Sequence, residues 1–230
     1  MEKCYIIYKK GKGERKMASY PIHMAFAKLI NEKLNMDENS IMLGSVAPDI
    51  CYMGENKMKS HFGSKNEKAN WKKFLYKYKE ELDNPFVMGC YSHLYLDYFF
   101  YSTFIEKYYH RVKKENGESV YISKKTGKEV KHSEIYSPKG IYRDYKITSY
   151  DTIKKYKLKY VYDTSNVRNV IDEIDTNKIK DINKGINKFP VIQNKEKTRC
   201  FEEKELDKFI REYSEKFIED IHNNFFNEAM

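Results

Sequence analysis

His93 and Asp97 lie four residues apart in a stretch, 86–105, that contains no other Asp, Glu, His, Lys or Arg. On an α-helix this spacing places both side chains on one face, one turn apart. Their neighbours are apolar or aromatic nearly all round, which is typical of a buried helix. Because a buried carboxylate is costly unless it is paired, hydrogen-bonded or bound to a metal, the pair predicts one of two things. It is either a hydrogen bond that fixes a core helix or a pair of metal ligands.

Three further residues of ligand type have apolar neighbours and are expected at or near the ends of helices. His23 falls in the first turn of a predicted helix, Asp49 follows Pro48 on a turn, and His61 interrupts a polar segment. A mixture of two or three histidines with one or two aspartates suits zinc and other divalent ions of borderline softness. A water bound to such an ion is acidic enough to supply hydroxide near neutral pH.

The elements that must position these residues follow from the spacing of apolar side chains. Helices are predicted over 21–34, 71–82, 86–110, 139–160 and 206–225, with a short helix at 170–174. Loops are predicted over 54–70 and 183–200. A charged β-hairpin or extended insertion is predicted at about 115–137, with its turn at Thr126-Gly127. The expected fold class is therefore mostly α, a single-domain helical bundle with a small β-hairpin insertion.

Length and cysteine usage narrow the class of protein. With 230 residues and 15% aromatic residues, the chain is long enough for one domain with a full core. Its four cysteines show no paired spacing such as Cys-x-x-Cys, which argues against a zinc finger and against a disulfide framework. No stretch approaches the ~20 apolar residues of a membrane span, and there is no signal-peptide pattern. Free thiols then make the cytoplasm the expected location.

The positive charge is concentrated at the start of the chain. The formal net charge is +9, and residues 1–16 hold six Lys or Arg against two Glu. This stretch is interpreted as a disordered basic leader or as a mis-annotated start that precedes a true start at Met17. The functional domain then covers 17–230. The remaining charge is compatible with a nucleic-acid partner but does not select one.

Four motifs follow one another in the first half of the chain. They are Tyr20-Pro21-Ile22-His23, Gly44-Ser45-Val46-Ala47-Pro48-Asp49, His61-Phe62 and Gly89-Cys90-Tyr91-Ser92-His93-Leu94-Tyr95-Leu96-Asp97. In this order, residues 17–105 resemble the zinc-dependent phospholipase C family, whose all-helical fold is shared with the S1/P1-type nucleases. The resemblance implies a helical bundle of the phospholipase C/P1 nuclease type.

The resemblance also implies roles for the candidate ligands. One metal ion would be held by Asp49, His61, His93 and Asp97, and a second by His23 with Asp97 as the bridge. Asp49 would be the catalytic residue that orients or deprotonates the attacking water.

The chain departs from the family in its third metal set. The amino-terminal Trp of the secreted phospholipases is absent, Thr103 stands where their second central-helix His would be, and no His-x-x-x-Glu pair follows. The chain is therefore expected to be a divergent intracellular relative with one or two zinc ions, or another divalent metal, instead of three.

The predicted function is that of a metal-dependent hydrolase that uses a zinc-bound hydroxide on a phosphoester. A small phosphoester or a phospholipid headgroup would be the substrate. The alternative is a non-catalytic binding or structural protein on the same helical scaffold, with a structural metal or none. A third hypothesis, nucleic-acid binding by the basic surface, needs no metal.

The remaining candidates carry less chemistry. Asp144 is expected either to complete the second metal's ligands, with Arg143 contacting a phosphate, or to form a helix-surface pair with it. His110 and His132 are expected to be solvated surface residues, and His222 is expected to be an ordinary residue on the flank of the last helix. Cys90 is expected to be a buried structural thiol.

Overall fold

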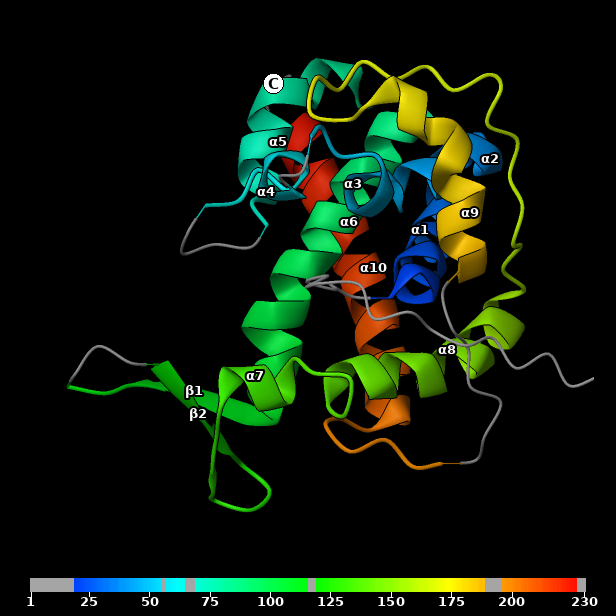
Figure 1. Ribbon diagram of the computed structural model, residues 1–230. Helices are drawn as coiled ribbons and strands as arrows, with labels where there is room; N and C mark the ends of the chain where they lie inside the picture. The colour runs from blue at the N-terminus through cyan, green and yellow to red at the C-terminus, as the bar shows by residue number, and fades with distance from the viewer. Residues whose placement is uncertain (1–18, 55–56, 65–68, 116–118, 189–195, 227–230) are drawn as a thin grey trace, which may run out of the picture.

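The computed structural model of this chain is mostly helical, as the sequence predicts, with one small antiparallel sheet (Figure 1). It describes residues 19–54, 57–64, 69–115, 119–188 and 196–226. The leader predicted over 1–16, and Met17 with it, lies outside the described residues.

Long helices form the body of the molecule, and short helices lie in the connections between them (Figure 1). The long helices are α1 (Tyr20–Leu34), α5 (Trp71–Tyr78), α6 (Pro85–Phe99), α8 (Ile141–Tyr156) and α10 (Glu203–Phe226). The short helices are α2 (Glu38–Gly44), α3 (Ala47–Ile50), α4 (Lys57–Ser60), α7 (His132–Ile135) and α9 (Ile182–Lys188).

Helix α6 is the central element of the fold. Its first turn is set by Pro85, whose fixed φ suits that position, and by Asn84, whose side chain accepts a hydrogen bond from the backbone N–H of Phe86. Every residue from Phe86 to Asp97 is buried, because α1, α2, α5 and α10 all pack against this helix. The helix that carries two candidate ligands is therefore held rigidly from all sides.

Two glycines set the close contact between α2 and α6. A methyl group at Gly89 would lie 2.2 Å from the carbonyl oxygen of Ile41 and 2.8 Å from the backbone nitrogen of Ser45. At Gly44, a methyl group would lie 2.1 Å from the carbonyl oxygen of Phe86. Only glycine allows the two backbones to approach this closely, and the contact brings the turn after α2 against the middle of α6.

The continuous helix predicted over 86–110 is wrong at its carboxyl end. Helix α6 ends at Phe99 and continues as a π-helical turn (Phe100–Phe104) and a 3₁₀ turn (Ile105–Lys107). The hydroxyls of Ser102 and Thr103 donate to backbone carbonyls one turn back, at 2.8 and 2.6 Å. Such bonds compete with the helical ladder.

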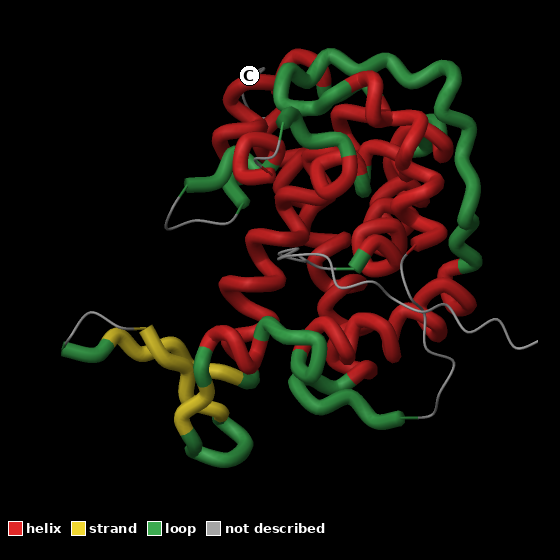
Figure 2. Tube along the Cα trace, in the orientation of Figure 1, coloured by secondary structure: helices red, strands yellow, loops and turns green. Residues whose placement is uncertain are grey.

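The sheet begins earlier than the predicted insertion at 115–137. Its strands are β1 (Tyr109–Lys113), β2 (Ser119–Ser123) and β3 (Glu129–Val130), paired antiparallel in that order. The predicted turn at Thr126-Gly127 is confirmed, and Gly127 has a φ of 67° that favours glycine. The sheet lies at one edge of the helical body (Figure 2).

Two predictions in the second half of the chain are wrong. The expected helix at 170–174 is an irregular segment in which Ile174 forms a β-bridge with Tyr52. The expected loop over 183–200 contains α9, whose Ile182 and Ile186 are buried one turn apart. The loop over 54–70 likewise contains the single turn of α4.

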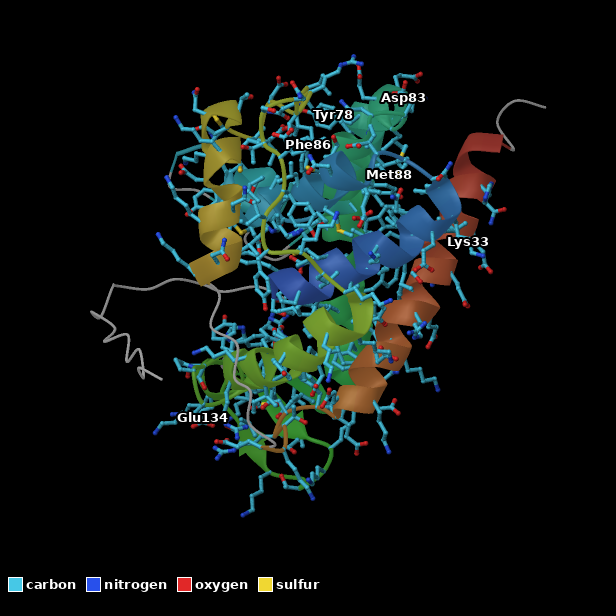
Figure 3. The ribbon with its side chains drawn as sticks, turned by 90° about the vertical axis from the view of Figure 1, so that its right-hand side faces the viewer. Lys33, Tyr78, Asp83, Phe86, Met88 and Glu134 are labelled. Atoms are coloured by element: carbon cyan, nitrogen blue, oxygen red, sulfur yellow. The ribbon has the colours of Figure 1, made fainter. Side chains whose placement is uncertain are left out.

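Aromatic side chains dominate the core. The ring of Phe217 from α10 lies 5.7 Å from the ring of Phe26 and 5.0 Å from the rings of Tyr91 and Tyr95. In Figure 3, Tyr78, Phe86 and Met88 lie at one end of the molecule, and Glu134 of α7 lies at the other. No helix within the described residues is both long and apolar enough to cross a membrane.

Candidate metal centre

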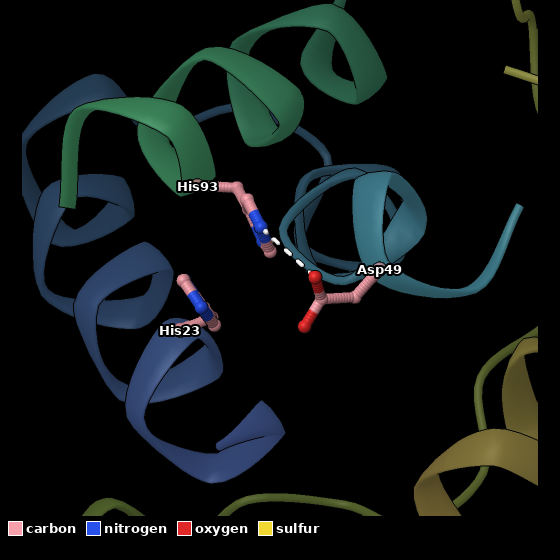
Figure 4. A group of neighbouring side chains, drawn as sticks. All are labelled: His23, Asp49 and His93. Carbon is pink, nitrogen blue, oxygen red and sulfur yellow. Dashed lines mark ion pairs between the residues drawn. The ribbon is translucent and has the colours of Figure 1, made fainter. Parts of the chain in front are cut away.

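Five side chains of ligand type converge at one buried place, and all five are the residues that the sequence singles out. His23 comes from α1, Asp49 from α3, His61 directly follows α4, and His93 and Asp97 come from α6. Their exposed fractions are 1%, 8%, 1%, 1% and 0% in that order. Figure 4 shows His23, Asp49 and His93 directed toward one another.

Four of the donor atoms form a tight set. The Nε2 atom of His61 lies 3.2 Å from Oδ1 of Asp49 and 3.6 Å from Oδ2 of Asp97. The Nε2 atom of His93 lies 3.6 and 3.7 Å from the same two oxygens and 3.2 Å from Nε2 of His61. Donors about 2.0–2.1 Å from a tetrahedral zinc ion are about 3.3 Å apart. The five distances therefore suit ligands of one zinc ion, and two groups of three, His61 with His93 and Asp97 and His23 with Asp49 and His93, have donor atoms close enough together to hold an ion.

Backbone carbonyls fix the orientation of two imidazole rings. Nδ1 of His93 lies 2.7 Å from the carbonyl oxygen of Ser45, and Nδ1 of His61 lies 2.9 Å from that of Lys57. Because a carbonyl only accepts, Nδ1 of each ring must carry the proton and donate it. In the neutral rings the Nε2 lone pairs are then directed at the cluster, as in histidines that bind metals.

A serine secures the segment that carries His61. The hydroxyl of Ser60 donates to the carbonyl oxygen of Pro48 at 2.7 Å and lies 3.1 Å from Nδ1 of His61. This bond ties α4 to α3, so that the donors of Asp49 and His61 are positioned together.

His23 occupies the second predicted metal position. Its ring stacks on the ring of His93 with centroids 3.8 Å apart, and its Nε2 atom lies 3.5 Å from Oδ1 of Asp97. Asp97 therefore directs one carboxylate oxygen at His23 and the other at His61 and His93. A carboxylate placed in this way can bridge two ions.

Buried polar atoms at this place lack hydrogen bonds. Within the described residues, no hydrogen-bond partner is found for the two ring nitrogens of His23 or for either oxygen of Asp97. The alternative of a His93–Asp97 hydrogen bond is not supported, because 3.7 Å is too long for one. Unpartnered buried donors and acceptors are costly, and a bound cation would satisfy them.

Lys57 also contacts the cluster, although it is not among the residues predicted from the sequence. Its ammonium nitrogen lies 2.5 Å from Oδ1 of Asp49, and its side chain is 24% exposed. Lys57 is four residues before His61, so one helical turn brings it to the same side of the segment. The four-residue spacing can be read from the sequence. The sequence does not indicate that Lys57, and not the nearby Lys59, contacts the cluster.

The cationic neighbours lower the pKa of both carboxyl groups. Burial alone would raise the pKa of Asp49, but the charges of Lys57 and His93 outweigh it and hold this pKa well below its usual range. For Asp97, burial is likewise outweighed, chiefly by His23, and the pKa is lowered. Both groups are therefore carboxylates near neutral pH, as metal ligands must be.

The three imidazoles differ in the direction of their pKa shifts. Burial lowers the pKa of His23 and of His61. Burial would also lower the pKa of His93, but the carboxylates, Asp49 foremost, outweigh it and raise this pKa. The metal-free cluster therefore keeps its most basic site between the two aspartates.

The structure corrects the interpretation of Asp144. Its side chain is fully buried and accepts hydrogen bonds from the backbone nitrogens of Arg199 and Cys200, at 2.8 and 2.6 Å. Arg143 contacts it at 3.3 Å. Asp144 therefore ties the segment before α10 to α8, and the expected surface pair is wrong because one partner is buried.

The remaining sequence candidates fall outside the cluster. His110 and His222 are exposed, and His132 is exposed with its ring 4.4 Å from that of Tyr136. Cys90 is buried, as predicted. A separate groove of about 1780 Å³ lies between α8, α10 and the turn after β2, and none of the five cluster residues lines it.

The fold and the site together define a mostly helical protein with a buried His/Asp cluster that could hold a metal ion. No known family model, curated protein or solved structure matches the chain.

Proposed function

We propose that this protein is a metal-dependent hydrolase of phosphoesters, with a helical fold of the phospholipase C/P1 nuclease type. The observation that carries the proposal is that the Nε2 atoms of His61 and His93 lie 3.2–3.7 Å from each other and from one oxygen each of Asp49 and Asp97, as ligands of one zinc ion do. These residues would hold the first ion. His23 and the outer oxygen of Asp97 would contribute to a second.

The chemistry of the proposal divides between the ion and the chain. When bound, a zinc ion would polarise a phosphoryl oxygen and make a water acidic. Asp49 has a second carboxylate oxygen, which can orient the attacking water or accept its proton. His61 and His93 keep their orientation through carbonyl bonds from Nδ1, so the centre is already arranged before a substrate arrives.

The burial of the cluster favours the second candidate function, a binding or structural protein with a structural metal. The side chains of the five donors are at most 3% exposed, and structural zinc sites are closed whereas catalytic sites keep a position open. The two candidates make the same prediction for metal content but opposite predictions for hydrolysis.

The first test is the metal content of protein purified without a chelator. We expect one or two equivalents of zinc in the wild type and in His110→Ala, which changes an exposed histidine outside the cluster. His93→Ala and Asp97→Ala should lose the metal, because each removes a donor of the four-atom set. Elemental analysis of the four proteins measures this directly.

Hydrolysis then separates the two candidates. Zinc-loaded wild type should release p-nitrophenol from bis(p-nitrophenyl) phosphate or from p-nitrophenyl phosphorylcholine, and Asp49→Asn should not. A zinc-loaded wild type that hydrolyses neither ester, yet melts at a lower temperature after chelation, would support the structural candidate. A wild type without metal, even after zinc is supplied, would contradict both metal-containing candidates and leave a binding or structural protein with no metal.

A further inference from the structure

Lys57 contacts two of the four residues that would hold the first ion. Its ammonium lies 2.5 Å from Oδ1 of Asp49, and its carbonyl oxygen accepts the Nδ1 proton of His61 at 2.9 Å. Its side chain is 24% exposed, whereas the side chains of Asp49 and His61 are 3% and 1% exposed. Lys57 is therefore a place where this buried centre reaches solvent.

The charge of the centre becomes positive when one divalent ion binds. Asp49 and Asp97 supply two negative charges and Lys57 supplies one positive charge. The metal-free centre is thus negative by one charge while His93 is neutral and has no net charge while His93 is protonated, and one divalent ion on neutral histidines makes it positive by one. An anion is attracted only to the loaded centre.

The position of the ammonium suits contact with such an anion. The oxygen of Asp49 that Lys57 contacts is the same oxygen that lies 3.2 Å from Nε2 of His61 and 3.6 Å from Nε2 of His93. An ion that binds this oxygen shares its negative charge and weakens its hold on the ammonium. The ammonium has three N–H donors and is a phosphate-binding group, so it can then donate to a ligand beside the ion.

We propose that Lys57 is the anion-binding residue of the centre and donates to a phosphoryl oxygen of the ligand on the solvent side of the metal. This inference rests on the proposed function, because it assumes that the four donors hold an ion. The inference adds the Lys57 ammonium to the anion-binding groups of the centre. The resemblance to the phospholipase C family implies only metal ions there.

Binding of inorganic phosphate to zinc-loaded protein tests the role of Lys57. The variant Lys57→Met removes the charge and keeps the length of the side chain. The matched control is Lys59→Met, because Lys59 is exposed in the same short helix and forms no ion pair within the described residues. Isothermal titration calorimetry with phosphate, after elemental analysis for zinc, gives both readouts.

We expect Lys57→Met to retain zinc and to bind phosphate about 10-fold to 100-fold more weakly, as the loss of one charged hydrogen bond implies. Lys59→Met should bind phosphate as the wild type does. Lys57→Arg keeps the charge and should retain most of the affinity, which keeps the test valid if Lys57→Met folds poorly. Wild type without zinc should bind phosphate weakly.

Two results would overturn the inference. Equal phosphate affinity in Lys57→Met and wild type would show that the ammonium does not contact the anion. Loss of zinc from both Lys57 variants would show that Lys57 only holds the donors in place. If the zinc-loaded wild type hydrolyses no ester, while Lys57→Met still binds phosphate more weakly than the wild type, the proposed function is contradicted. The role of Lys57 in anion binding then stands.

Discussion

At the scale of single residues, the candidate centre consists of five polar side chains that are buried among apolar ones. His93 and Asp97 stand alone in an apolar stretch, and Asp49 lies between apolar neighbours. Residue type and surroundings were enough to select them. Lys57 could not be selected, because its importance comes from contact with Asp49 in the folded chain, and nothing in a polar, lysine-containing segment marks that contact.

The raised pKa of His93 predicts that zinc and protons compete for the centre. A free imidazole has a pKa of about 6.5, and the carboxylates beside His93 keep its proton to a higher pH in the metal-free protein. Zinc needs the neutral ring. Zinc affinity should therefore rise with pH until His93 is deprotonated and level off above that point, with protons released on binding below it.

Calorimetric zinc titrations between pH 6 and 8 measure this competition. Two buffers of different ionisation enthalpy give the number of protons released. His110→Ala is the control, because that histidine is exposed and outside the cluster. A zinc affinity that is the same at every pH would contradict the prediction.

At the scale of elements, the long amphipathic helices were predictable from apolar spacing, and the short ones were not. Helix α10 shows a regular repeat, whereas α4 and α9 cover only Lys57–Ser60 and Ile182–Lys188. One turn in α4 and about two in α9 carry too few positions to establish a period. The end of α6 could not be predicted for a different reason. Hydroxyl groups of Ser102 and Thr103 bond to the backbone at the π-helical turn, and the spacing of apolar residues does not reveal such bonds.

The glycine contact between α2 and α6 predicts that Gly89→Ala disturbs the centre. The added methyl group would clash with backbone atoms of Ile41 and Ser45, and the carbonyl of Ser45 is the partner of His93. Overpacking of this kind costs about 1–3 kcal/mol. We expect a lower free energy of unfolding and weaker zinc binding, measured by urea titration and by competition with a chelator.

Gly185→Ala is the matched control for this prediction. Gly185 lies in α9, and a methyl group there would meet the side chain of Ile50, which can move, instead of backbone. Its effect should be smaller on both measures. Equal stability and equal zinc affinity in Gly89→Ala and wild type would show that α2 adjusts without moving the centre.

At the scale of the whole molecule, the mostly helical class was predictable, but the placement of parts was not. The sheet begins at Tyr109 instead of near 115, and Asp144 joins α8 to the segment before α10 through backbone nitrogens of Arg199 and Cys200. Contacts between segments more than fifty residues apart leave no local pattern in a single sequence.

Zinc should stabilise the whole fold, because its ligands join α1, α3, the residue after α4, and α6. At a free zinc concentration 100 times the Kd, the stabilisation is about 2.7 kcal/mol, or roughly 5–10 °C in Tm for a chain of this size. Thermal denaturation with zinc and with chelator measures the shift. His93→Ala should show almost none, and an unchanged Tm in the wild type would count against a metal centre.

The short helix α4 leads us to expect that the candidate centre exchanges an ion through local opening of one segment. Two donors stand on the rigid α6, but His61 follows a single turn that is held to α3 by the Ser60 bond to Pro48. Short elements of this kind open locally at a small fraction of the free energy of global unfolding. The rate at which an ion is released and captured would then depend on the local opening of residues 57–61. The lifetime of a bound metal would reflect the dynamics of this segment and not the stability of the fold.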